Sequence, residues 1–193
     1  MARPRKFDEG EVVQKAMRAF WQCGYEATTM KSLQAATGVD VRGLSNAFGD
    51  KEQLFLRSLE NYHAMFEMGL AKIFKQPSLD AIITFFTQLA NDDIPEDHPT
   101  NYGCLMVNTV IELGNTNSEV RMRVERYRQM FVDHFRNSLM ASGVPEVDDK
   151  SELLVGMLWG ALTQIRFSGS KSAAKPMALQ ILKILDSWQS NPK

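Results

Sequence analysis

One short polar segment of this sequence carries side chains whose types and spacing could form specific hydrogen bonds to a partner. Val41, Arg42, Ser45 and Asn46 recur at a spacing that places them on one face of a helix. Arginine can donate two hydrogen bonds to guanine, and asparagine can pair with adenine in the major groove. The segment therefore predicts a helix whose outer face meets base edges.

The residues before this segment predict the element that braces it. Met30, Leu33 and Ala36 recur at helical spacing. Gly38 then interrupts the pattern where a left-handed conformation is needed, and Asp40 can cap the next helix. Two short helices joined by a glycine turn are typical of a helix-turn-helix. The alternative interpretation is an αα-hairpin that only packs against a core.

Helices are also predicted on both sides of this pair. Asp8 suits the start of a first helix, which Gly24 can close, and the apolar face between them contains Val13, Ala16, Met17, Phe20 and Trp21. Asp50, with Gln53 three residues later, is a capping signature for a long helix reaching about residue 74. A unit of roughly fifty residues is marginal alone, so we expect it to pack against the C-terminal part of the chain.

The rest of the chain predicts further helices and no strand. We expect them at residues 79–90, 102–114, 118–142 with Ser118 as cap, 149–167 and 175–189, with a polar, proline-containing loop over 91–101. The predicted fold class is all-α. We expect two domains, a helix-turn-helix domain over residues 1–55 and a helical effector-binding and dimerisation domain over residues 56–193.

Composition narrows the function classes. Of 193 residues 44% are hydrophobic, which is enough for a core, and no apolar run is long enough to span a bilayer. Cys23 and Cys104 form no disulfide framework, and no Cys/His spacing indicates zinc. The three histidines are scattered and no phosphate-binding loop is present, so we expect no enzyme, metal or cofactor. A cytoplasmic protein is the expectation.

Charge is distributed unevenly along the chain. The net charge is -1, but residues 1–57 hold nine Lys/Arg against seven Asp/Glu. The N-terminal part therefore has a positive net charge, which is the sign expected if only this part contacts phosphate. Arg3, Arg5 and Lys6 are interpreted as a DNA-reaching arm, with a solvated, frayed terminus as the alternative.

The last two predicted helices each carry an apolar stripe with 4, 3, 4 spacing, broadened by neighbouring apolar residues. Two such helix pairs from two chains would form a four-helix bundle. The alternative is that both stripes are buried inside one chain. We predict a homodimer interface at Leu154, Leu158, Ala161, Ile165, Met177, Ile181, Ile184 and Trp188.

The N-terminal fifty-five or so residues resemble the tetracycline-repressor (TetR) family of bacterial transcription regulators. Three stretches carry the resemblance, which are AFW followed by GYEATTM (19–30), LQAATGV (33–39) and AFGDKEQLF (47–55). The resemblance implies a homodimer that binds a palindromic operator in double-stranded DNA, usually represses, and is released when a small molecule enters the C-terminal domain.

By this resemblance Thr29 would cap the second helix and touch phosphate, and Lys51 would pair with phosphate. The full set of predicted DNA-binding residues is Arg3, Arg5, Lys6, Thr28, Thr29, Lys31, Val41, Arg42, Ser45, Asn46 and Lys51. The sequence departs from the family pattern at Ser45, Ala47 and Asp40. The carboxylate of Asp40 can still cap a helix but repels phosphate.

An effector site in such a domain is a mostly apolar cavity with a few polar groups. We expect a flat aromatic or extended apolar effector. Candidate lining residues are Met65, Phe66, Phe85, Phe86, Leu89, Met106, Asn108, Met130, His134, Trp159 and Gln164, and for each position taken singly the favoured alternative is an ordinary core residue.

Cys104 lies in a GCLMVN segment that resembles one subset of the family, in which a cysteine responds to electrophiles or oxidants. A thiol at a helix start ionises more readily. The alternatives to a ligand-released repressor are therefore a regulator that senses through Cys104, and a constitutive or activating regulator without ligand response.

Overall fold

The computed structural model describes residues 7–91, 95 and 98–190, and in these ranges it is helical without strands. Three short helices form the N-terminal unit, α1 (Glu9–Cys23), α2 (Met30–Thr37) and α3 (Val41–Phe48). The predicted all-α class is confirmed. Among the described residues no helix combines the length and hydropathy needed to cross a bilayer.

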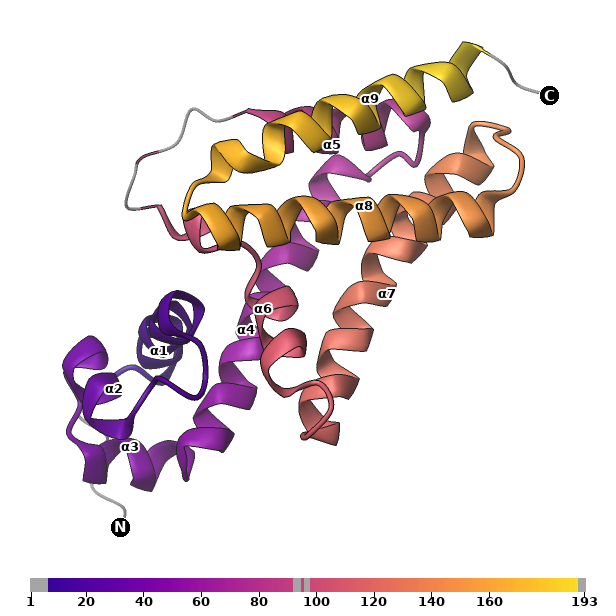
Figure 1. The fold of residues 1–193 in the computed structure, drawn as a ribbon. Helices are drawn as coiled ribbons and strands as arrows, with labels where there is room; N and C mark the ends of the chain where they lie inside the picture. The colour runs from indigo at the N-terminus through magenta and orange to yellow at the C-terminus, as the bar shows by residue number, and fades with distance from the viewer. Residues whose placement is uncertain (1–6, 92–94, 96–97, 191–193) are drawn as a thin grey trace.

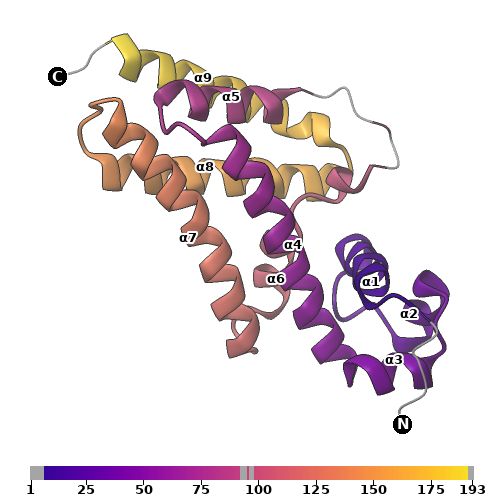
Figure 2. The ribbon, with the colours of Figure 1, turned by 180° about the vertical axis from the view of Figure 1, so that it is seen from behind.

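The remaining helices form the larger unit. They are α4 (Lys51–Ile73), α5 (Leu79–Ala90), α6 (Leu105–Leu113), α7 (Ser118–Ala141), α8 (Val147–Ser168) and α9 (Lys175–Ser190), with short 3-10 helices η1 (Pro99–Tyr102) and η2 (Lys171–Ala174). Figure 1 shows α4 leading from the N-terminal unit up to α5, with α7 beside α6 and α8. From behind, α5 lies along α9 at the far end of the molecule (Figure 2).

Local capping explains where the first helices begin and end. The Asp8 and Asp50 carboxylates accept from the backbone N–H groups three residues on, each at 2.9 Å, as the sequence predicts. Helix α7 differs, because its cap is Asn117, whose side chain accepts from the Val120 N–H at 3.1 Å, and Ser118 is already helical.

The core is continuous from α1 to α9. Phe20 and Trp21 of α1 belong to the same buried cluster as Tyr62 of α4, Tyr127 of α7 and Leu158 of α8. The predicted domain boundary at residue 55 falls inside α4, whose first turns pack against α1. The N-terminal unit therefore shares its core with the larger helical unit, as its small size requires.

Candidate DNA interface and effector cavity

The helix-turn-helix is held by short-range contacts. Thr29 and Ser32 form a capping box at the start of α2, with the Ser32 N–H donating to Thr29 Oγ1 at 3.1 Å. Gly38 has φ +77°, the left-handed conformation that lets α2 end, and Asp40 Oδ1 accepts from the Gly43 N–H at 2.7 Å. These contacts confirm the predicted turn and both predicted caps.

The face that this turn presents is polar and exposed. Val41, Arg42, Ser45 and Asn46 are all exposed, while Leu44 on the opposite side is fully buried. The inward pattern of α2 differs from the expectation, because Thr37 is buried and Ala36 is exposed. A step of four residues from Leu33 returns to the same side of a helix more nearly than a step of three does.

The other predicted DNA-contact positions differ in their surroundings. Thr28 is 2% exposed and its hydroxyl donates to the Gly24 carbonyl at 2.6 Å, so its side chain closes the α1–α2 turn, and the predicted DNA contact is wrong. Lys51 Nζ donates to the Tyr25 carbonyl at 3.0 Å and lies 4.0 Å from the centre of its ring. Thr29 and Lys31 are exposed. The predicted arm residues Arg3, Arg5 and Lys6 lie outside the described residues.

Hydrogen bonds from three side chains help to attach the N-terminal unit to distant parts of the larger helical unit. The backbone N–H groups of Tyr25 and Glu26 donate to the Glu112 carboxylate on α6, at 3.0 and 2.7 Å. The Arg166 guanidinium on α8 donates to the carbonyl of Gln22 at 3.0 Å. The Trp21 indole N–H donates to the carbonyl of Gly103 at 3.0 Å. None of these contacts was predicted, since each joins residues more than eighty positions apart.

A largely apolar cavity of about 260 Å³ lies directly beside this attachment. Its walls come from α1, α4, α5, α7 and α8, and from the segment between η1 and α6. The lining residues are Trp21, Tyr62, Phe66, Phe85, Gln88, Leu89, Thr100, Gly103, Cys104, Tyr127, Phe131, Leu158, Leu162, Ile165 and Lys171. A concave, apolar space with few polar groups has the character of a small-molecule site.

The sequence identified part of this lining. Phe66, Phe85 and Leu89 line the cavity as expected, and so does Cys104, which was singled out as a possible sensor and not as a lining residue. The other candidates do not, for three different reasons. Phe86 and Met106 are fully buried core, and the Asn108 amide donates to the Tyr102 carbonyl. Met65 is 39% exposed and Gln164 is exposed. Trp159 packs against the core without reaching the cavity. Helical periodicity shows which residues share one side of a helix. Whether that side faces a cavity depends on the other helices packed around it.

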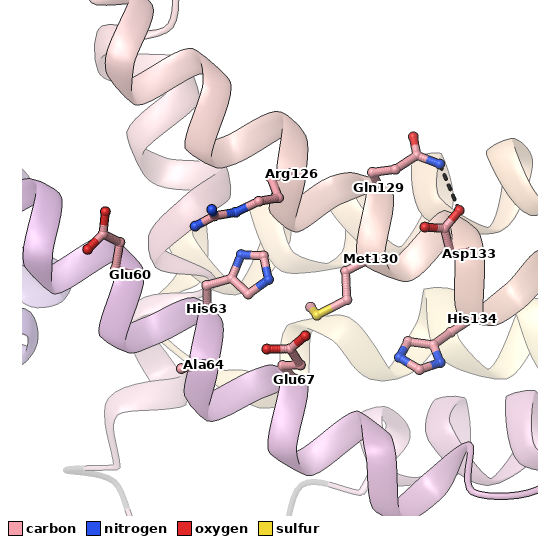
Figure 3. Close-up of a pocket in the computed structure, with 9 residues that line it drawn as sticks. All are labelled: Glu60, His63, Ala64, Glu67, Arg126, Gln129, Met130, Asp133 and His134. Carbon is pink, nitrogen blue, oxygen red and sulfur yellow. Dashed lines mark hydrogen bonds between the residues drawn. The ribbon is translucent and has the colours of Figure 1, made fainter.

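Met130 and His134 line a different hollow, an open polar groove of about 550 Å³ between α4 and α7. Figure 3 shows His63 between Arg126 and Met130 on its wall. Burial lowers the pKa of His63, Arg126 lowers it further, and Glu67 opposes both. In the described part of the chain no group of three or more His, Cys, Asp or Glu is placed to hold a metal ion.

Cys104 sits between two tyrosines in the cavity wall. The Tyr62 hydroxyl donates to Cys104 Sγ at 3.4 Å, and the thiol donates to the Tyr127 hydroxyl at 3.8 Å. Burial raises the pKa of the Cys104 thiol, whereas its place at the start of α6 had predicted easier ionisation. Desolvation in the apolar wall outweighs the dipole of a short helix. Cys23, in contrast, is exposed.

The predicted dimer stripe is largely internal. Leu154, Leu158, Ala161 and Ile165 are buried, as is Ile181 on α9, because they face the chain's own α5, α7 and α9. Met177 and Trp188 are half-buried against the same core, and Ile184 is half-buried. The interface predicted at these positions is therefore wrong for the buried ones. The apolar residues that α8 leaves outside are Leu153, 49% exposed, and Phe167, 89% exposed.

Comparison with known proteins agrees with this architecture. The sequence profile described as bacterial regulatory proteins, tetR family, matches residues 12–57. The chain is 35% identical over 121 residues to the HTH-type transcriptional repressor ComR of Escherichia coli, an alignment covering 61% of this chain and 57% of ComR. It is 25% identical over 142 residues to YezE of Bacillus subtilis, an uncharacterised HTH-type transcriptional regulator, covering 72% of each.

Among solved structures, the fold matches a cysteine mutant of the TetR family regulator CifR complexed with 26 bp double-strand operator DNA. The TM-score is 0.81 with 21% identity, over 94% of this chain and 98% of that one. The alignment with ComR leaves more than a third of that repressor unmatched, whereas the structural match extends over nearly the whole length of both chains. The helix-turn-helix, the larger helical unit and these relatives agree with one another, and the chain is similar to the TetR family of bacterial regulatory proteins, whose profile matches its N-terminal unit.

Proposed function

We propose that this protein is a transcription regulator that binds a palindromic operator as a homodimer, represses, and releases the DNA when a small molecule enters the cavity. The observation that carries the proposal is the outer face of α3. There Arg42, Ser45 and Asn46 are exposed on a helix fixed at its start by Asp40 and oriented by the left-handed Gly38. Such a face suits a major groove.

The proposed release of DNA by a ligand is supported by a contact between the N-terminal unit and the cavity. Trp21 is a residue of α1 and also lines the cavity, so a ligand would touch the DNA-reading unit directly. A ligand shifts the equilibrium only by binding the DNA-incompetent state better than the competent one. The tilt of α4 and the α1 contacts are the elements that would differ between the two states.

The homodimer is proposed through the outer face of α8. Leu153 and Phe167 are exposed there, and Gly156 between them has no atom within 4 Å of where a Cβ would lie. A face with small residues between apolar ones allows a second copy to approach closely. The two recognition helices would then read half-sites about 34–36 Å apart.

The test is binding to DNA from around the protein's own gene, against random DNA, at two salt concentrations. We expect sequence-specific binding with two protomers per site. Arg42→Ala and Asn46→Ala should weaken specific binding by about 1–3 kcal/mol. Lys72→Ala, which removes a positive charge at the far end of α4, is the matched control and should change little. Binding equal on both DNAs would contradict the proposal.

The dimer has its own test in native mass spectrometry. Gly156→Glu or Leu153→Glu should give monomers, because each places a charge in the proposed interface. Met122→Glu on α7, where Met122 is 58% exposed, is the control and should leave the dimer intact. Monomeric wild-type protein at micromolar concentration would refute the α8 interface.

A further inference from the structure

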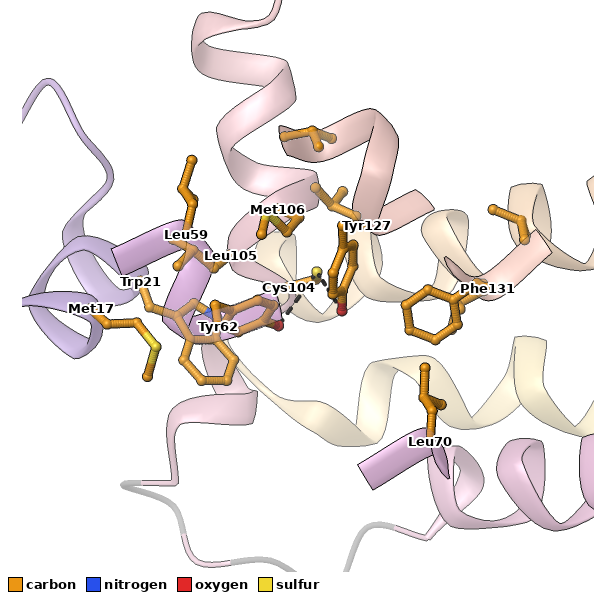
Figure 4. Close-up of a cluster of buried hydrophobic side chains, with 14 of the residues drawn as sticks. Met17, Trp21, Leu59, Tyr62, Leu70, Cys104, Leu105, Met106, Tyr127 and Phe131 are labelled. Carbon is orange, nitrogen blue, oxygen red and sulfur yellow. Dashed lines mark hydrogen bonds between the residues drawn. The ribbon is translucent and has the colours of Figure 1, made fainter. Parts of the chain in front are cut away.

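The interior end of the cavity is a hydrogen-bonding cluster inside an aromatic wall. The hydroxyls of Tyr62 and Tyr127 converge on the sulfur of Cys104 (Figure 4). Phe66 and Phe131 pack against Tyr127 with ring centres 5.8 and 5.2 Å away. Burial raises the pKa of all three polar groups, so at neutral pH the cluster carries no charge.

The hydrogen bonds inside this cluster are weak ones. Sulfur is a poor acceptor and a thiol is a poor donor. A ligand oxygen placed among Tyr62, Cys104 and Tyr127 would therefore give the two hydroxyls a better partner than they have now. The cluster is arranged to receive one polar group, while the rest of the wall receives apolar surface.

The cavity offers a charged ligand little compensation for lost hydration. None of the described lining residues is Asp or Glu. Lys171, the one cation among these described lining residues, already donates from Nζ to the carbonyl oxygens of Gln88 and Asn91. A buried charge without a counter-ion is costly. This argues against a cationic effector, and an anionic one would have to draw Lys171 away from the partners that it already has.

The volume of the cavity limits the size of the ligand that it can hold. An engineered apolar cavity of about 150 Å³ in another protein accommodates benzene. In proportion, the 260 Å³ here holds roughly ten non-hydrogen atoms. That is one substituted aromatic ring, and a fused three-ring compound would not fit without opening the wall.

We infer that the effector is an uncharged, single-ring aromatic molecule with one carbonyl, amide or hydroxyl group that bonds to the Tyr62–Cys104–Tyr127 cluster. This inference rests on the proposed function and narrows its ligand class. The ring lies against the aromatic wall and Trp21. The polar group replaces the Cys104 sulfur as the hydrogen-bond partner of the two tyrosine hydroxyls.

The test uses the full chain without DNA and four probes of similar size, measured by ligand-observed NMR titration. Benzamide is neutral with a polar group, ethylbenzene is neutral without one, benzoate is an anion and benzylammonium a cation. We expect benzamide to bind most tightly. Tyr62→Phe and Tyr127→Phe should weaken benzamide about threefold to tenfold and leave ethylbenzene unchanged. Both substitutions conserve ring volume, and Tyr102→Phe, outside the cavity, is the matched control.

Any of four results would overturn the inference. They are tighter binding of benzoate or benzylammonium than of benzamide, no binding of benzamide, unchanged benzamide affinity in both Tyr→Phe variants, and tighter binding of the three-ring anthraquinone. Failure of the proposed function is separate, because it would appear as absent operator binding by the ligand-free protein and would leave these titrations unaffected.

Discussion

The indole N–H of Trp21 donates to the carbonyl oxygen of Gly103 at 3.0 Å, across 82 positions of sequence. Both residues line the cavity. Gly103 has φ +78°, and a Cβ there would lie 2.8 Å from the Leu162 carbonyl oxygen, so only glycine lets the chain pass between α1 and α8. The bond joins the N-terminal unit to the larger helical unit in the wall of the cavity.

Replacement of Trp21 tests this bond. Trp21→Phe should lower the free energy of unfolding by about 1–3 kcal/mol, because the buried Gly103 carbonyl loses its donor. Trp159→Phe is the matched control, since the Trp159 indole nitrogen is buried without a hydrogen-bond acceptor among the described residues and its removal relieves an unsatisfied group. Urea unfolding measures both, and an equal or larger loss in Trp159→Phe would contradict the assignment.

The Glu112 carboxylate should hold the α1–α2 turn in place. Glu112→Ala removes the acceptor for the Tyr25 and Glu26 N–H groups, so we expect these two amides to exchange with deuterium much faster. Operator affinity should fall with them, because the recognition helix loses part of its support. Glu112→Gln retains one acceptor oxygen and should be intermediate. Unchanged exchange at both amides in the alanine variant would show that the contact does not order the turn.

Asp40 should limit DNA affinity. Its carboxylate caps α3 but stands on the side proposed to meet phosphate. Asp40→Asn keeps a capping side chain and removes the negative charge, so we expect severalfold tighter operator binding at low salt and a smaller gain at high salt. Fluorescence anisotropy at two salt concentrations measures this. Asp80→Asn at the start of α5, where Asp80 also lies in a first helical turn, should leave affinity unchanged.

The two cysteines should differ in reactivity. Burial raises the pKa of Cys104, so its thiolate fraction at neutral pH is below that of an ordinary thiol, and the exposed Cys23 should be alkylated first. Because ionisation of Cys104 is shifted upward, its alkylation rate should still be rising with pH above the ordinary thiol range. Iodoacetamide labelling of Cys23→Ser and Cys104→Ser over a pH series checks this. Faster labelling of Cys104 than of Cys23 at pH 7 would support sensing through this thiol instead.

Local features of the fold were readable from the sequence. The helix start at Asp8, the caps at Asp40 and Asp50 and the turn at Gly38 were all predicted correctly. Each depends on residues at most a few positions apart, so the interacting groups are adjacent in the chain itself. For the same reason the exposed face of α3 followed from helical periodicity once Leu44 was placed inside.

The tertiary structure decided what lies opposite each helix. Helix α8 is apolar on two sides, and periodicity alone could not tell that Leu154 and Leu158 face the core while Leu153 and Phe167 face outward. The cavity draws its wall from residues as far apart as Trp21 and Lys171. Sequence spacing sets which residues share a helix face, but only packing against distant segments determines whether that face meets core, cavity or solvent.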